Sequence, residues 1–169
     1  MFRLRLSLSI FLLIVFPAVA ADISGPVRVV DGDTLDMDGV RIRLWGIDAP
    51  ENDQTCQGRD GQTYECGRDS AAVMRELTRD RRVECESRGR DRYQRVVAIC
   101  RTERGEINAA IVRRGWAVDW PRYSNGRYQA EERAAQAEGL GIWSGRFETP
   151  WEWRQQHRKD HSSRIGLGQ

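Results

Sequence analysis

The sequence contains almost no lysine or histidine. Lys159 is the only lysine, and both histidines, His157 and His161, lie in a polar stretch near the carboxyl end. We therefore do not expect a mechanism in which histidine is the acid, base or nucleophile. The positive charge is carried almost entirely by arginine, which makes the planar, two-pronged contacts that phosphate groups accept. Because GC-rich coding also favours arginine, this bias alone does not identify a phosphate ligand.

Long apolar runs are also missing, apart from one at the amino end. Two arginines precede an apolar run, residues 6–19, which ends in Ala18-Val19-Ala20. This pattern is typical of a secretory signal peptide cut after Ala20. The run is too short and too interrupted to favour a membrane anchor. We expect residues 1–20 to be removed and the protein to be secreted or periplasmic, with no stable membrane association.

The chain has no excess of charge of either sign once this leader is removed. The full sequence has 27 basic and 25 acidic residues. Arg3 and Arg5 leave with the leader, so the remaining charges balance. A protein that grips duplex nucleic acid by bulk charge would be strongly basic. Any contact with nucleic acid must therefore be local.

The four cysteines lack the C-x-x-C spacing of common zinc sites, and neither histidine lies near them. An even number of cysteines behind an export signal favours two disulfides. Of the three possible connectivities we favour Cys56–Cys66 and Cys85–Cys100. The first would close a polar, glycine-rich loop, and the second would join two strands of a predicted hairpin.

The chain shows no internal repeat, and its length after the leader suits one domain with one core. Hydrophobic periodicity and turn signals predict strands at 27–30, 34–38, 40–45, 82–86 and 93–101, and helices at 68–78, 106–114 and 127–138. Asp38-Gly39 is a hairpin signal, and residues 87–90 are expected to form a turn. Residues 52–67 are predicted to be an exposed loop, and residues 157–169 are expected to fray.

Five short strands, with a helix between the third and the fourth, fit a small Greek-key barrel. The predicted fold class is thus α+β, mainly β: a five-stranded OB-fold barrel with about three helices. Patterning alone does not select this fold over other α+β arrangements. The expected organisation is a signal peptide (1–20), the barrel domain (21–150) and a carboxyl-terminal tail (151–169).

Residues with useful chemistry are concentrated between positions 31 and 51. An acidic Asp-Gly-Asp turn ends at Asp33, and a predicted strand carries Arg43. Asp48 and Glu51 then flank Ala49 and a proline that ends the next strand. Carboxylates suit a hard cation and arginine suits a phosphate. One short segment therefore supplies candidate groups for both.

A calcium site is predicted from Asp33 and Asp48, with a backbone carbonyl and water in the other positions. Ligands that are all oxygen and carry little charge imply weak calcium binding. An EF-hand is the rival interpretation, because Asp31 and Asp36 each begin a similar acidic pattern. It fails because the twelfth position of such a loop must be glutamate, whereas counting from either aspartate reaches isoleucine.

Splitting a phosphodiester requires stabilised charge on the phosphate oxygens and an oriented water. Arg43 and Arg95 could each present two donors to one phosphate. Glu51 has no other assigned role and could orient or deprotonate the water. Arg92 and Tyr93 are expected to hold a terminal phosphate or to stack on a sugar and base.

Several separated motifs together resemble the staphylococcal nuclease (thermonuclease) family. They are Asp31-Gly32-Asp33-Thr34, the run 43–51, the segment 91–95, the run 107–117 and Gly141-Ile142-Trp143, in the family's order over residues 25–147. The resemblance implies an OB-fold, one calcium ion on Asp33, Asp48 and the carbonyl of Ala49, a phosphate clamp of Arg43 and Arg95, and Glu51 as general base. The family has threonine at the position of Ala49 and usually glycine at that of Gln94.

The expected function is that of an exported, calcium-dependent, sugar-non-specific nuclease. The resemblance implies 3′-phosphate products from DNA and RNA, and we expect a monomer that prefers single-stranded or frayed substrate. One alternative is a non-catalytic OB-fold module that binds single-stranded nucleic acid or carbohydrate. Another is a secreted structural domain stabilised by calcium, but that hypothesis leaves Arg43 and Arg95 unexplained.

Overall fold

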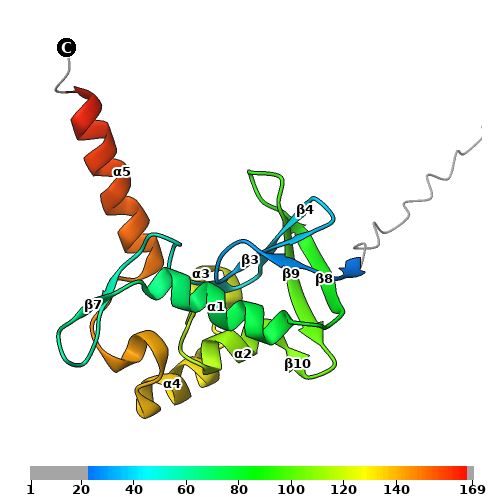
Figure 1. Ribbon diagram of the computed structural model, residues 1–169. Coiled ribbons are helices and arrows are strands. Elements are labelled where there is room, and N and C mark those ends of the chain that lie inside the picture. The colour runs from blue at the N-terminus through cyan, green and yellow to red at the C-terminus, as the bar shows by residue number, and fades with distance from the viewer. Residues whose placement is uncertain (1–22, 167–169) are drawn as a thin grey trace, which may run out of the picture.

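The computed structural model describes residues 23–166 (Figure 1). The predicted signal peptide and the last three residues lie outside this part. The main sheet contains β1 (Ile23–Gly25), β2 (Arg28–Val29), β3 (Thr34–Met37), β4 (Val40–Leu44), β8 (Val83–Arg90), β9 (Val96–Thr102) and β10 (Gly105–Glu106). Its order is β1-β8-β9-β4-β3-β2, with β10 also paired to β9. The β4–β9 pair is parallel and the others are antiparallel.

One continuous stretch of chain supplies the first and the last strand of this order, β1 and β2. β1 pairs with β8 and β2 pairs with β3, and only Pro26 and Val27 separate β1 from β2. Proline has no backbone N–H for a ladder, so the change of partner falls where pairing is already broken. If β1 and β2 count as one interrupted strand, the sheet has the five principal strands of an OB-fold. The predicted fold class, α+β and mainly β, is confirmed.

The β3–β4 hairpin lies between β9 and β2 in the sheet and follows directly from the sequence. Its turn uses Asp38 and Gly39, both with positive φ (50° and 85°), which matches the predicted hairpin signal. Leu35, Ile42 and Leu44 are at most 1% exposed and lie in the main core. The hairpin thus holds its apolar side in the core and brings Thr34 opposite Arg43.

Residues 23–166 contain five α-helices where about three were predicted. They are α1 (Cys66–Thr78), α2 (Ile107–Arg113), α3 (Pro121–Ser124), α4 (Gln129–Glu138) and α5 (Pro150–Gly166). A 3-10 turn, Gly141–Ser144, lies between α4 and α5. The three predicted helices correspond to α1, α2 and α4. Fully buried Asn108 fixes α2, because its Oδ1 accepts the N–H of Cys100 at 3.0 Å and its Nδ2 donates to the carbonyl of Trp45 at 3.0 Å.

Three local predictions were wrong. Residues 87–90 do not form the predicted turn, since β8 continues to Arg90 with a shift of register after Ser87. The expected loop 52–67 contains a small hairpin, β6 (Cys56–Gln57) with β7 (Thr63–Tyr64), and the start of α1. Residues 157–166, expected to fray, belong to α5, which projects from the body of the molecule in Figure 1.

Both predicted disulfides are present. Cys85 and Cys100 lie directly opposite each other on β8 and β9, with Cα atoms 4.1 Å apart. Cys56 and Cys66 join the β6–β7 hairpin to the first residue of α1 and belong to a second apolar cluster with Val118 and Ile142. In the described part of the chain, no helix is both long enough and apolar enough to cross a membrane.

Candidate active site

Asp33 lies in the turn before β3, where its carboxylate reaches the segment that contains Asp48. Its Oδ2 accepts the N–H of Ala49 at 2.7 Å, and its Oδ1 accepts the hydroxyl of Thr34 at 3.2 Å. The N–H of Asp33 in turn donates to Oδ1 of Asp31 at 3.0 Å, which shapes the acidic turn. The side chain is almost completely buried. The turn therefore holds one carboxylate against the backbone beside the second.

Arg43 joins these two carboxylates. Its guanidinium makes an ion pair with Asp33 through Nη1, and its Nη2 donates to Oδ1 of Asp48 at 2.6 Å. Asp48 is fully buried in β5 (Ile47–Asp48), which pairs with β11 (Val118–Asp119). Burial lowers the pKa of Arg43, and the charge of Arg95 lowers it further, while Asp48 and Asp31 oppose the shift. Arg43 thus joins the two acids from a nearly buried position.

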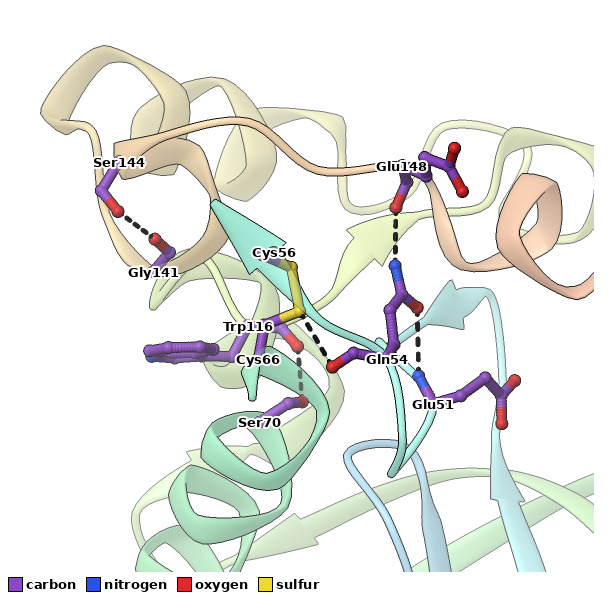
Figure 2. Close-up of a disulfide and its surroundings, with 9 residues drawn as sticks. All are labelled: Glu51, Gln54, Cys56, Cys66, Ser70, Trp116, Gly141, Ser144 and Glu148. Atoms are coloured by element: carbon purple, nitrogen blue, oxygen red, sulfur yellow. Dashed lines mark hydrogen bonds between the residues drawn. A yellow bond between two sulfur atoms is a disulfide. The ribbon is translucent and has the colours of Figure 1, made fainter. Parts of the chain in front are cut away.

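Glu51 follows β5, and buried contacts hold its backbone. The side chain of Gln54, itself fully buried, accepts the N–H of Glu51 at 3.2 Å and donates to the carbonyl of Glu148 at 2.8 Å (Figure 2). A Cβ atom on Gly67, in the first turn of α1, would overlap the carbonyl oxygen of Glu51. Figure 2 shows the carboxylate of Glu51 pointing away from the nearby disulfide. The backbone is thus fixed while the carboxylate stays one-third exposed.

The residues 91–95 form a loop between β8 and β9 that is organised by Asp91. Its Oδ2 accepts Nε–H of Arg95 at 2.7 Å, and its Oδ1 accepts the backbone N–H groups of Tyr93 and Arg95. Burial opposes the shift, but these bonds and the charge of Arg95 lower the pKa of Asp91. Arg92 and Arg95 both lie over the ring of Tyr93, with Cζ atoms 4.8 and 5.6 Å from its centre.

A cleft of about 610 Å³ brings several predicted residues together. Its lining includes Arg43, Arg92, Tyr93 and Arg95 on the barrel side, and Trp120, Arg122, Tyr123, Trp151 and Arg154 from the region of α3 and α5. Asp33, Asp48 and Glu51 do not line it directly. Arg43 and Arg154, which do line the cleft, contact them. The cleft therefore presents arginine and aromatic residues, together with Asp91.

Sequence reasoning missed Arg154. Its Nη1 lies 3.0 Å from Oδ1 of Asp48 and 2.6 Å from Oε1 of Glu51, and its Nη2 lies 2.8 Å from Oδ2 of Asp48. Burial alone would lower the pKa of Arg154, but the hydrogen bonds and charges of both carboxylates raise it. The sequence signal was weak. The tryptophans at 151 and 153 indicated docking on the barrel, but nothing in the sequence indicated which residues Arg154 would contact.

The predicted calcium ligands supply only oxygen. Asp33 and Asp48 flank one guanidinium, and the contact between Asp33 and the N–H of Ala49 places that backbone beside them. Two carboxylates with a carbonyl match the preference of calcium for hard oxygen donors. Over residues 23–166, however, no group of three or more histidine, cysteine, aspartate or glutamate side chains could hold a metal ion. The donor chemistry fits a weakly bound cation, with few protein ligands.

Known proteins of similar sequence include nucleases. The family model described as staphylococcal nuclease homologue matches residues 41–145. A succinoglycan biosynthesis protein, ExoI, of Rhizobium meliloti is 38% identical over 135 residues, which cover 78% of this chain and 71% of that protein. An uncharacterized endonuclease of Escherichia coli is 36% identical over 152 residues (85% and 92%), and a micrococcal nuclease of Shigella flexneri is 30% identical over 169 residues (89% and 91%). This chain belongs to the staphylococcal nuclease family.

Proposed function

We propose that the protein is an exported, calcium-dependent nuclease that hydrolyses DNA and RNA without selecting the sugar and leaves 3′-phosphate ends. The observation that carries this proposal is the double contact of Arg43 with Asp33 and Asp48, since Arg43 also lines an arginine-rich cleft. A purely structural site would not need this arginine to face a cleft that also contains Arg95. The endonuclease and micrococcal nuclease names of the relatives support the same chemistry.

The two arginines are assigned to the phosphate. Arg43 and Arg95 line one cleft, so both can face the equatorial oxygens of a bound phosphodiester, where negative charge develops in the transition state. Asp91 restrains Arg95 through its Nε, which leaves the terminal nitrogens of that guanidinium available to a phosphate. Arg92 and Tyr93 lie on the same loop and would contact the next phosphate, sugar or base.

Glu51 is assigned to the attacking water. Its carboxylate is one-third exposed on a fixed backbone, so it can orient a water or accept its proton. Asp33, Asp48 and the carbonyl of Ala49 would hold the calcium ion, which would neutralise charge on the phosphate oxygens. Export fits the leader pattern in the sequence and the two disulfides.

The test uses the full chain, exported with its own leader into an oxidising compartment and purified. Single-stranded DNA and RNA are incubated with this protein in calcium or in a calcium chelator, with Glu51→Gln as a parallel sample to exclude contaminating nucleases. We expect calcium-dependent digestion to 3′-phosphates that is lost in the variant. Cleavage that persists in chelator would overturn the calcium assignment.

A non-catalytic binding module remains the second candidate, favoured by one comparison. The relative from Rhizobium meliloti is named for succinoglycan biosynthesis, which favours a carbohydrate as the alternative ligand. Folded protein that cleaves neither DNA nor RNA, but shifts the mobility of an oligonucleotide or binds succinoglycan, would favour this candidate. Cleavage that requires Glu51 would reject it.

A further inference from the structure

Arg154 connects the last helix to the carboxylates at the centre of the site. Its guanidinium makes a two-pronged contact with Asp48 and a further bond of 2.6 Å to Glu51. The residue lies on α5, beyond residues 41–145 that match the family model. A segment outside the matched domain thus contacts two residues to which we assign catalytic or ligand roles.

Local packing holds this arginine in place. Thr149 and Glu152 form a capping pair at the start of α5, in which Oε2 of Glu152 accepts the hydroxyl of Thr149 at 2.6 Å and its N–H at 3.2 Å. Trp151 stacks on Trp120 with ring centres 6.0 Å apart and planes 13° apart. The Cζ of Arg154 lies 5.6 Å from the centre of the Trp120 ring. The contact with the carboxylates therefore comes from an anchored helix.

The two guanidinium groups link three carboxylates in one row. Arg43 lies between Asp33 and Asp48, and Arg154 lies between Asp48 and Glu51. Without these positive groups, the three acids would repel one another in a partly buried region. The row also makes Asp48 the shared member, since both arginines contact it.

Binding of a cation to Asp48 would affect the two bonds that Arg154 makes to Asp48 differently from the bond that it makes to Glu51. Asp48 is fully buried; its Oδ2 accepts a bond from Arg154, and its Oδ1 accepts bonds from both Arg154 and Arg43. A cation bound by Asp48 must compete with the guanidinium for these oxygens. The bond from Arg154 to Glu51 can persist, because it uses a different carboxylate.

We propose that Arg154 is a further positioning residue of the active site, which holds the Glu51 carboxylate beside Asp48 and yields its bonds to Asp48 when a divalent cation binds there. The proposal rests on the proposed function for the roles of Asp48 and Glu51. It adds a residue of the carboxyl-terminal helix to the site. It also predicts that this residue weakens metal binding but increases turnover.

The test compares the full chain with Arg154→Gln and Arg154→Lys, using calorimetric titration with calcium alone and steady-state cleavage of single-stranded DNA. Arg154→Gln removes the competing charge, so calcium should bind about tenfold more tightly. The same change frees Glu51, so kcat should fall about 10- to 100-fold with a smaller effect on KM. Arg154→Lys keeps the charge, and its calcium affinity should stay near that of the wild type while kcat recovers in part.

A matched control is Arg133→Gln. It removes the same charge from an exposed position on α4 that does not line the cleft, and should change neither quantity. If Arg154 had only a structural role, Arg154→Gln would loosen the site and weaken calcium binding and turnover together. Unchanged or weaker calcium binding in Arg154→Gln would therefore overturn the proposal. If that variant unfolds on heating below the assay temperature, Arg154→Lys decides, and equal kcat to wild type overturns it.

The role of Arg154 and the proposed function are contradicted by different results. Wild-type protein that cleaves and binds calcium, with Arg154→Gln behaving identically, removes the role of Arg154 and leaves the proposed function intact. Wild-type protein that neither binds calcium nor cleaves removes the proposed function and, with it, the role of Arg154.

Discussion

At the residue scale, single side chains of the site each contact more than one partner. Arg43 contacts Asp33 and Asp48 with separate nitrogens of one planar guanidinium. A lysine ammonium has the same charge but cannot reproduce that forked geometry. The consequence is that charge and geometry can be separated by substitution at this position.

Arg43→Lys is expected to keep the fold and lower kcat about 100-fold or more, because an aimed pair of donors to the phosphate is lost. The measurement is steady-state cleavage of single-stranded DNA in saturating calcium. Arg41→Lys is the matched control, since Arg41 lies two residues earlier on the same strand and pairs with Asp36 at the surface. Similar losses in both variants would contradict the assignment.

Gln94 has a positive φ of 64° in the loop that presents Arg95. Glycine adopts this conformation freely, whereas other residues are strained there. Gln94→Gly should therefore raise the free energy of unfolding by up to about 1 kcal/mol, after the added freedom of the unfolded chain is subtracted. Chemical denaturation measures this, with Gln94→Ala as the control that should give no gain. A less stable glycine variant would refute the strain argument.

Residue types and spacing predicted most of the side chains that meet at this site. Asp33, Arg43, Asp48 and Glu51 stand in one short segment, and the structure brings their carboxylates and guanidinium into contact, directly or through Arg154. Arg154 could not be inferred in this way, because its partner Asp48 is 106 residues away. No local pattern encodes a contact that only the packing of α5 creates.

At the element scale, the start of α1 supports the segment that carries Glu51. Gly67 lies against the carbonyl of Glu51, and its own N–H donates to the carbonyl of Gln54 at 3.2 Å. The helix can approach this closely only because residue 67 has no side chain. The first turn of α1 therefore acts on the site without supplying a functional group.

Gly67→Ala should destabilise the protein by about 1–3 kcal/mol, because the new methyl overlaps backbone that cannot move independently. It should also lower kcat by displacing Glu51. Thermal unfolding and cleavage rates measure the two effects. Arg68→Ala, at the next and exposed position of the same turn, should leave both nearly unchanged. A stable and fully active Gly67→Ala protein would show that the segment 51–54 can shift freely.

Elements with a strong local signal were predicted well, and those stabilised by tertiary contacts were not. The Asp38-Gly39 turn fixed the β3–β4 hairpin, and apolar spacing fixed α1, α2 and α4. The sequence Ser-Arg-Gly-Arg at 87–90 indicated a turn, yet pairing with β9 carries β8 through it with a shift of register. The β6 and β7 strands are two residues each, too short for any periodic pattern.

At the scale of the whole molecule, the two disulfides act on different regions. Cys85–Cys100 joins β8 and β9 in the main core, far along the chain from Glu51. Cys56–Cys66 lies in the second cluster, and Cys66 Sγ is 3.4 Å from the carbonyl oxygen of Gln54, the residue that holds the backbone of Glu51. The first bond therefore serves the barrel, and the second also serves the site.

Replacing both Cys85 and Cys100 by alanine should lower the free energy of unfolding by about 3 kcal/mol, the value expected for a closed loop of this size. At temperatures where the protein stays folded, kcat should be nearly unchanged. The comparison variant replaces Cys56 and Cys66 and should lower kcat as well as stability. Denaturant titration and cleavage rates decide this, and equal kcat losses in the two variants would contradict the division of roles.

The single stretch that forms both ends of the sheet order also bears on how the chain reaches this fold. Residues 23–29 are synthesised before every other strand, yet Ile23 pairs with Cys85, a more distant partner than the one Ile42 finds in Val96. Closing so long a loop costs chain entropy and slows folding. Barrel closure is therefore expected late, after β8 exists and has paired with β9. Until then the outer edge of β8 lacks its partner β1, so a fault in this segment would first appear as slow folding and aggregation, before any change in the finished structure.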